Sequence, residues 1–217
     1  MAAPLDPRRK RRSRPSGSGG PSAYTRRNGP ILVATMVAAA VLTRMAFHGP
    51  AGRVPALAFA IAGVLLAGTY LSGGMPRPHK TGRHPVVGPV LTAAALLAAF
   101  ALLDGLSRLV PPVHHATQTV LARADLTTAL VLGTIAASVA EELFYRGALF
   151  ERVRLPILTT TVAHMLTTLP AANVALTATA GLLGLVLGIT RRTSGGWWAP
   201  AVTHVAWAFM VLAWLPR

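Results

Sequence analysis

The chain has 217 residues, of which 53% are hydrophobic and 12% are charged, and its mean hydropathy is +0.51. This composition excludes an ordinary soluble domain and indicates a polytopic membrane protein. Cysteine is absent, so a disulfide framework, a thiolate metal site and a cysteine nucleophile are excluded as well.

The formal net charge of +15 is distributed unevenly along the chain. Eight basic residues lie within residues 1–30, including the run RRKRRSR at 8–14. Proline, serine and glycine are abundant after this run, which is typical of disorder. We interpret residues 1–30 as a disordered, basic, cytoplasmic tail. Its alternative role is a specific contact with nucleic acid or protein, but we expect membrane lipid as its partner and no nucleic acid.

Seven apolar segments can be drawn after the tail, separated by clusters of proline, glycine and charge. Several are shorter than the ~20 residues that a perpendicular span needs, so the count is approximate. The sequence predicts an all-α, polytopic membrane protein of about seven transmembrane helices, with one group of helices at 31–126 and a second unit at 127–217. The segments are 31–47, 55–72, 86–103, 127–149, 155–169, 173–190 and 197–215.

Basic residues between the segments predict the orientation in the membrane. With the tail inside the cell, alternate loops place 16 of the 21 basic residues on the cytoplasmic side. This distribution agrees with the positive-inside rule. We therefore expect a multi-pass protein of the cell membrane with a cytoplasmic N-terminus and an external C-terminus. Outside the tail, the cytoplasmic set is Arg77, Lys80, Arg83, Arg146, Arg152, Arg154, Arg191 and Arg192.

Two adjacent glutamates, Glu141 and Glu142, lie inside the apolar stretch 127–150. An acidic residue at the centre of a membrane helix costs roughly 2.5–3.5 kcal/mol on insertion scales, so such residues need partners. Arg146 is four residues beyond Glu142, a spacing that places both on one helix face as an ion pair. Glu141 points about 100° away and can address a different neighbour. The pair therefore indicates a functional site, and the alternative is a charge network that stabilises the end of the helix.

The predicted topology brings two histidines to the depth of the glutamates. At 1.5 Å per helical residue, Glu141 would lie ~9 Å from the cytoplasmic boundary. By the same arithmetic, His164 would lie ~14 Å and His204 ~11 Å from that boundary. A single histidine in a membrane helix can simply hydrogen-bond a neighbouring helix. Three ionisable residues at one depth favour a common site.

Other polar and aromatic residues receive plainer interpretations. Trp197 and Trp198 are typical of anchors at the membrane interface. The pattern formed by Gly181, Gly184 and Gly188 predicts a close contact between helices. Five further histidines fall in predicted loops, where we expect them to be solvated: His48, His79, His84, His114 and His115.

The chain resembles the CaaX protease and bacteriocin-processing family, also called CPBP or Abi proteins. The resemblance rests on EELFYRG at 141–147, on His164 one segment later, and on GLLGLVLGITRRTSGGWWAPAVTHVAWAF at 181–209. It covers residues 127–215. It implies a membrane-embedded protease whose catalytic core is the helical unit at 127–217, acting on a membrane-associated protein or peptide.

The resemblance also implies catalytic roles for five residues. Glu141 matches the family glutamate that activates water together with a histidine, which is His164 here. Glu142 and Arg146 match the second glutamate and the arginine of the same motif. His204 matches the last histidine, which stabilises the oxyanion in the family proposal.

Two positions depart from the family pattern. Thr160 stands where a phenylalanine is usual, and Ala208 stands where an asparagine is expected to assist the oxyanion. Losing one oxyanion donor lowers rates by about a hundred- to a thousandfold. An intramembrane endopeptidase is therefore the leading prediction. The alternatives are an impaired relative acting as an immunity or scaffold protein, and a small proton-coupled transporter.

The metal dependence of such a site stays open at this point. A carboxylate that removes a proton from water needs no metal, and we prefer this mechanism without a cofactor. Glu141, His164 and His204 could instead ligate zinc with an open fourth position. The chain has no HExxH motif, so the spacing gives zinc no separate support.

Overall fold

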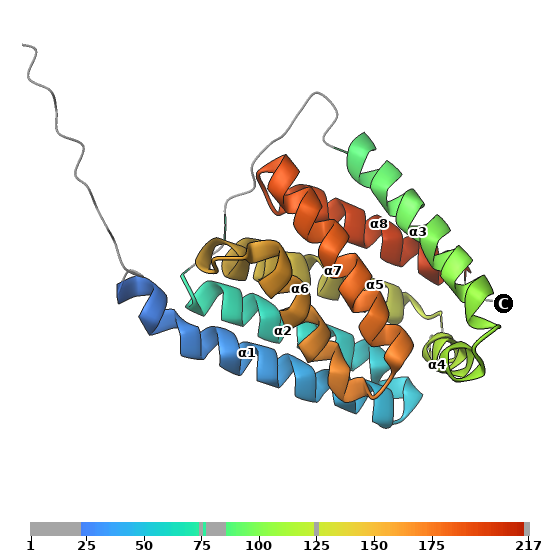
Figure 1. Cartoon of the computed structure of the whole chain (residues 1–217). Helices are drawn as coiled ribbons and strands as arrows, with labels where there is room; N and C mark the ends of the chain where they lie inside the picture. The colour runs from blue at the N-terminus through green and yellow to red at the C-terminus, as the bar shows by residue number, and fades with distance from the viewer. Residues whose placement is uncertain (1–22, 74–75, 77–85, 124–125, 215–217) are drawn as a thin grey trace, which may run out of the picture.

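The computed structural model describes residues 23–73, 76, 86–123 and 126–214 (Figure 1). Residues 1–22, most of the predicted tail, lie outside this range, as do Arg77, Lys80, Arg83, His79 and His84. Every regular element in the described part is helical, which confirms the predicted all-α fold. The α-helices are α1 (Ala23–His48), α2 (Val54–Leu71), α3 (Val87–Ser107), α4 (Pro111–Leu121), α5 (Thr128–Glu141), α6 (Pro156–Thr168), α7 (Val174–Ser194) and α8 (Trp198–Trp214). Shorter elements are η1 (Ala51–Arg53), the π-helix η2 (Glu142–Leu149), η3 (Phe150–Arg152) and η4 (Leu169–Ala171).

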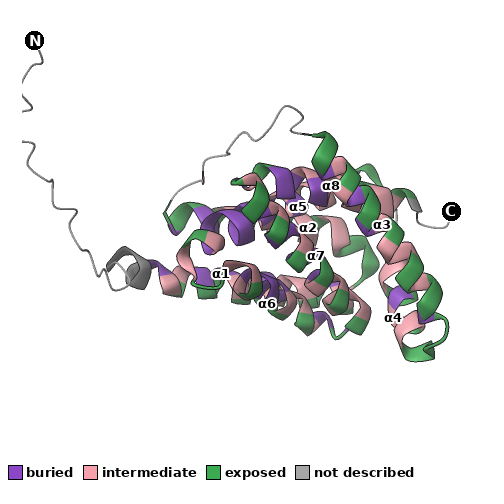
Figure 2. Ribbon diagram, turned by 45° about the horizontal axis from the view of Figure 1, so that its top comes forward, coloured by how far each residue is buried: buried purple, intermediate pink, exposed green. Residues whose placement is uncertain are grey.

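Among the described residues, five segments are long and apolar enough to cross a bilayer, so the chain is a multi-pass membrane protein. Large apolar side chains such as Val37 and Val41 on α1 point outward, as expected of a surface that faces lipid. Figure 2 shows buried residues on the inner faces of the helices and exposed ones along the outer faces. The five spans are Asn28–His48, Ala51–Leu71, Val87–Ser107, Thr128–Arg152 and Val174–Ser194, and Trp198–Ala213 is a shorter apolar helix.

Helices that follow one another in the chain, such as α1 and α2 or α7 and α8, run in opposite directions. In Figure 1, α2 returns alongside α1, and α8 returns from the end of α7. Asn173 caps the start of α7 by accepting a hydrogen bond from the Leu176 backbone N–H at 2.9 Å. Gly195, with φ of +72°, ends the same helix in a left-handed conformation that favours glycine. Helix α4 packs beside the end of α3 (Figure 1). The end of α7 lies on the opposite side of the bundle from α4.

Helix α4 was not among the seven predicted segments, and its two histidines are not in a loop. Its sequence PPVHHATQTVL mixes polar and apolar residues, so a search for apolar runs overlooks it. Proline at the first helical positions is compatible with a helix start. His115 is exposed, as expected, but His114 is half-buried and its Nδ1 lies 3.2 Å from Ser107 Oγ. The expectation of a solvated loop is therefore wrong for His114.

The predicted close contact of the glycines on α7 is confirmed. A Cβ atom added to Gly184 would lie 3.1 Å from the Thr161 Cα, and one added to Gly188 would lie 3.1 Å from Ile157. Such distances are too short for a larger residue without movement of α6. The glycines thus allow α7 to pack directly on α6, which places the backbone of α7 near the buried residues of η2.

Candidate active site

The acidic motif lies where helix α5 changes its winding. The α-helix ends at Glu141, and Glu142–Leu149 continues as a π-helix with its characteristic i→i+5 hydrogen bond from Phe150 N–H to Tyr145 O. All eight residues of η2 are buried. A helix buried on every side cannot form hydrogen bonds to water. The polar side chains of this segment therefore need specific partners on the neighbouring helices.

Glu142 and Arg146 form a fully buried ion pair. Arg146 Nη1 donates to Glu142 Oε1 at 3.1 Å, and both side chains are 0% exposed. The same carboxylate oxygen lies 2.9 Å from His204 Nδ1 on α8. Arg146 Nη2 donates to the carbonyl oxygen of Gly184 at 3.1 Å. The pair thus joins η2 to both α7 and α8, and it orients the imidazole of His204.

Glu141 faces two histidines from other helices. Its Oε2 lies 3.3 Å from His164 Nε2 on α6 and 3.9 Å from His204 Nε2 on α8. The side chain of Glu141 is 22% exposed, whereas the two histidine side chains are 6% and 7% exposed. Glu141 is therefore the accessible carboxylate of the pair, and Glu142 is the enclosed one.

His204 connects the two glutamates through its two ring nitrogens. A carboxylate oxygen only accepts hydrogen bonds, so with Glu142 ionised the proton of His204 Nδ1 points at Glu142. This bond fixes the ring so that Nε2 faces Glu141. The arrangement leaves Nε2 available for a substrate or a water molecule beside Glu141.

Tyr145 supports the ring of His164 and was not found from the sequence. The two rings stack with centroids 5.0 Å apart at an angle of 28°. The phenol oxygen lies 2.7 Å from Thr167 Oγ1, so the hydroxyl has a partner within α6. Tyr145 belongs to η2 and is buried, and its ring supports the imidazole of His164, which contacts Glu141.

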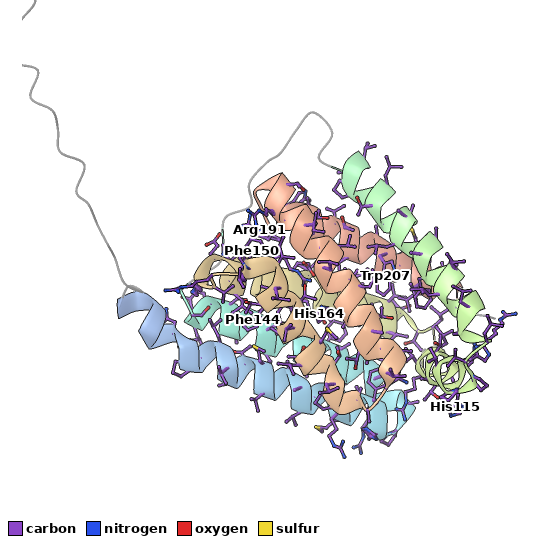
Figure 3. All side chains as sticks on the ribbon, in the orientation of Figure 1. His115, Phe144, Phe150, His164, Arg191 and Trp207 are labelled. Carbon is purple, nitrogen blue, oxygen red and sulfur yellow. The ribbon has the colours of Figure 1, made fainter. Side chains whose placement is uncertain are left out.

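Arg191 was predicted to lie in a cytoplasmic loop, and this prediction is wrong. It lies in the last turn of α7 and is buried. Its Nε donates to the carbonyl oxygen of Arg146 at 2.7 Å, and its Nη2 lies 3.1 Å from Glu151 Oε1. Its guanidinium also lies 5.2 Å from the centre of the Phe150 ring, and Figure 3 shows the two side chains together. Helix α7 therefore contacts Arg146 twice, through Gly184 at the side chain and through Arg191 at the backbone.

The comparison with protein families identifies this part of the chain. Residues 123–210 match the family model Rce1-like, described as type II CAAX prenyl endopeptidase Rce1-like. The segment is similar to an Rce1-like domain. The resemblance to the CaaX protease family is thereby confirmed for these residues, which include both glutamates and both histidines of the site. No curated protein and no solved structure matches the chain.

The two departures from the family pattern occupy buried positions in this segment. Thr160 is 0% exposed, and its hydroxyl donates to the carbonyl oxygen of Pro156 at 2.8 Å. Ala208 is 6% exposed and lies one turn beyond His204 on α8. Its methyl group cannot donate a hydrogen bond, so it offers nothing to an oxyanion beside His204.

The geometry of the site can also be compared with that of a zinc site. Zinc sites gather three protein ligands around one point at about 2.0–2.2 Å from each donor atom. Among the described residues, no group of three or more histidine, aspartate or glutamate side chains is arranged to hold a metal ion. His204 Nδ1 is engaged by Glu142, which leaves Nε2 as the ring nitrogen that faces Glu141. Zinc ligation by Glu141, His164 and His204 therefore stays a prediction.

Proposed function

We propose that the protein is an intramembrane endopeptidase that hydrolyses a peptide bond of a membrane-associated substrate. One observation carries the proposal: Glu141 is the accessible carboxylate, and it lies between the inward-facing Nε2 atoms of two buried histidines. The Rce1-like match of the same segment supports a protease.

The proposed reaction begins with a water molecule held by Glu141. Glu141 takes a proton from the water while the water oxygen bonds to the scissile carbonyl carbon. His164, which contacts the same carboxylate oxygen at 3.3 Å, orients Glu141. The proton then passes from Glu141 to the amine nitrogen as the carbon–nitrogen bond breaks. Every atom of the water ends in the two products, and no metal step is required.

His204 has a separate role in the proposal, which is to stabilise the negative charge on the carbonyl oxygen. With both nitrogens protonated, it donates through Nδ1 to Glu142 and through Nε2 to the oxyanion. Arg146 and Glu142 fix this ring from behind, because they are enclosed and connected to α7. They are positioning residues and do not touch the substrate.

The test is cleavage of a membrane-anchored peptide library by purified protein in nanodiscs. Glu141→Gln should abolish cleavage while it leaves the folded yield near that of the wild type, because the amide has the same shape. Chelator should leave the wild-type rate unchanged, and zinc should not raise it. Activity of Glu141→Gln equal to wild type removes the proposed base. Chelator-sensitive cleavage restored by zinc turns Glu141 and the histidines into ligands.

A second candidate function is favoured by Ala208. A relative with an incomplete oxyanion hole would retain the fold and bind a membrane-protein partner without cleaving it. In that case neither the wild type nor Glu141→Gln cleaves any library peptide. A proton-coupled transporter gives the same result in the cleavage assay but moves protons in sealed vesicles, with loss of the flux in Glu141→Gln.

A further inference from the structure

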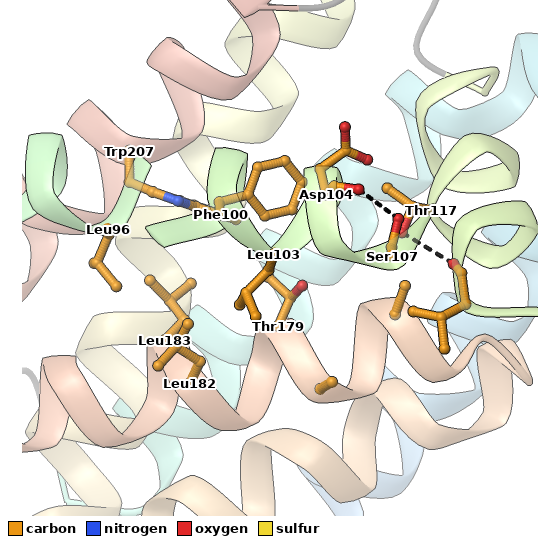
Figure 4. Close-up of a pocket in the computed structure, with 13 residues that line it drawn as sticks. Leu96, Phe100, Leu103, Asp104, Ser107, Thr117, Thr179, Leu182, Leu183 and Trp207 are labelled. Carbon is orange, nitrogen blue, oxygen red and sulfur yellow. Dashed lines mark hydrogen bonds between the residues drawn. The ribbon is translucent and has the colours of Figure 1, made fainter. Parts of the chain in front are cut away.

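A second site lies between α3, α4, α7 and α8, and its apolar end adjoins the proposed active site, because the Trp207 ring lies 6.2 Å from that of His204. A cavity of about 180 Å³ opens there, and none of the five predicted catalytic residues lines it. Figure 4 shows Trp207 and Leu96 toward one end of the cavity and Asp104 and Ser107 toward the other. The cavity is thus apolar at the end deeper within α3 and α8 and polar at the end near the last turn of α3.

The polar end contains a carboxylate oxygen without a partner. Asp104 Oδ1 is inaccessible to solvent and forms no hydrogen bond within the described residues. None of the ion pairs formed by the described residues includes Asp104. Asp104 as a whole is half-buried, but its enclosed Oδ1 has lost water without gaining a donor, so the site is suited to a ligand that brings a donor or a positive charge.

The hydroxyl groups around Asp104 do not supply that donor. Ser107 Oγ donates to the backbone oxygen of Asp104 at 2.6 Å, and Thr117 Oγ1 donates to the backbone oxygen of Val113 at 3.1 Å. Figure 4 shows both bonds as dashed lines. Because these protons stay within the helices, Ser107 and Thr117 offer no free donor to a negatively charged headgroup, whereas Asp104 Oδ1 offers a cation a free acceptor.

The apolar end sets the rest of the ligand. Trp207 packs edge-on against Phe100 with ring centroids 6.2 Å apart, and Leu183 lies on the opposite wall. A cavity of ~150 Å³ with apolar walls accommodates a benzene-sized molecule, so this one has room for a short length of alkyl chain. We propose that this cavity binds an amphiphile with a protonated amine, its amine against Asp104 and its alkyl chain against Trp207. Two sources share this chemistry, namely an amine-headgroup lipid and a free alkylamine.

The test measures binding of a bromoalkylamine through quenching of Trp207 fluorescence. The protein is placed in nanodiscs of phosphatidylglycerol, whose headgroup has no amine. Bromine on the chain quenches an indole it contacts, so Trp207→Phe should remove most of the quenching. Asp104→Asn should weaken binding by about tenfold or more, since it removes a charge-assisted bond and keeps the shape. Glu151→Gln is the matched control, and it should leave binding unchanged because Glu151 lies outside the cavity.

Competition separates the two sources and checks the chemistry. Displacement of the probe by phosphatidylethanolamine within the nanodisc identifies a lipid ligand, and displacement by dodecylamine alone identifies a free amine. Dodecanol and dodecyl sulfate should displace it at least about tenfold less well. Equal affinity of wild type and Asp104→Asn overturns the proposal, as does equal competition by the alcohol. Ala175→Leu adds a second check, because it narrows the cavity beside α4 and should lower affinity without changing the charge.

Discussion

Replacing Glu142 by glutamine should destabilise the protein far more than the same change at Glu141. Glutamine keeps the acceptor oxygen and the shape but removes the charge that faces Arg146 at 3.1 Å. Both members of the pair are 0% exposed, so Arg146 is left as an uncompensated buried cation. Removing one partner of a buried ion pair costs about 3–5 kcal/mol.

The expected change in melting temperature follows from this free energy. For a chain of this length, 1 kcal/mol shifts Tm by about 2–4 °C, so Glu142→Gln should lower Tm by ~6–20 °C. Glu141 is 22% exposed and contacts His164 at 3.3 Å, so Glu141→Gln should cost only about 1 kcal/mol. Thermal unfolding of the purified proteins in nanodiscs, followed by near-UV circular dichroism, measures both variants.

A double variant tests the reasoning. Arg146→Met in the Glu142→Gln background removes the orphaned cation and should recover at least half of the lost stability, because an apolar replacement of a buried pair is often close to neutral. Equal Tm for the two single glutamine variants would refute the assignment of Glu142 as the structural carboxylate. A double variant whose loss equals the sum of the two single losses would show that the charges are not coupled.

Three further predictions concern α7, α8 and the orientation in the membrane. Arg191→Ala should lower kcat with little change in KM, because it removes the hydrogen bond to the Arg146 carbonyl that positions the site. Arg191→Lys should restore only part of the rate. Equal loss of folded protein and of activity would make the role of Arg191 purely structural. Ala208→Asn should raise single-turnover cleavage about tenfold or more by adding an oxyanion donor, and a neutral or slower variant would show that the position is already served or too crowded. A cysteine at the exposed Thr193 should react with impermeant maleimide only after the cells are opened. A cysteine at the exposed Gln118 on α4 should react in intact cells. The reverse pattern would invert the predicted topology.

Sequence alone was sufficient for the class of protein, and it led to the candidate residues of the site. Hydropathy is a local property, so all seven apolar segments correspond to helices of the structure. Acidic residues in an apolar stretch are costly and therefore conspicuous. Depth in the membrane follows from residue count, and this argument already placed Glu141, His164 and His204 at one level, where the structure has them in contact. Helix α4 escaped because its sequence is not apolar.

Only the tertiary structure decided which histidine each glutamate contacts. A sequence cannot show that η2 is a π-helix, because that winding depends on packing that satisfies its buried backbone groups. The choice of Glu142 as the enclosed carboxylate, and of Glu141 as the accessible one, is made by the contacts of α7 and α8 around them. Arg191 looked like a topology signal because charge at a helix end is usually solvated, yet the close packing of α7 on α6 buries it against η2. The cavity at Asp104 likewise exists only where four helices meet, and a single segment carries no trace of it.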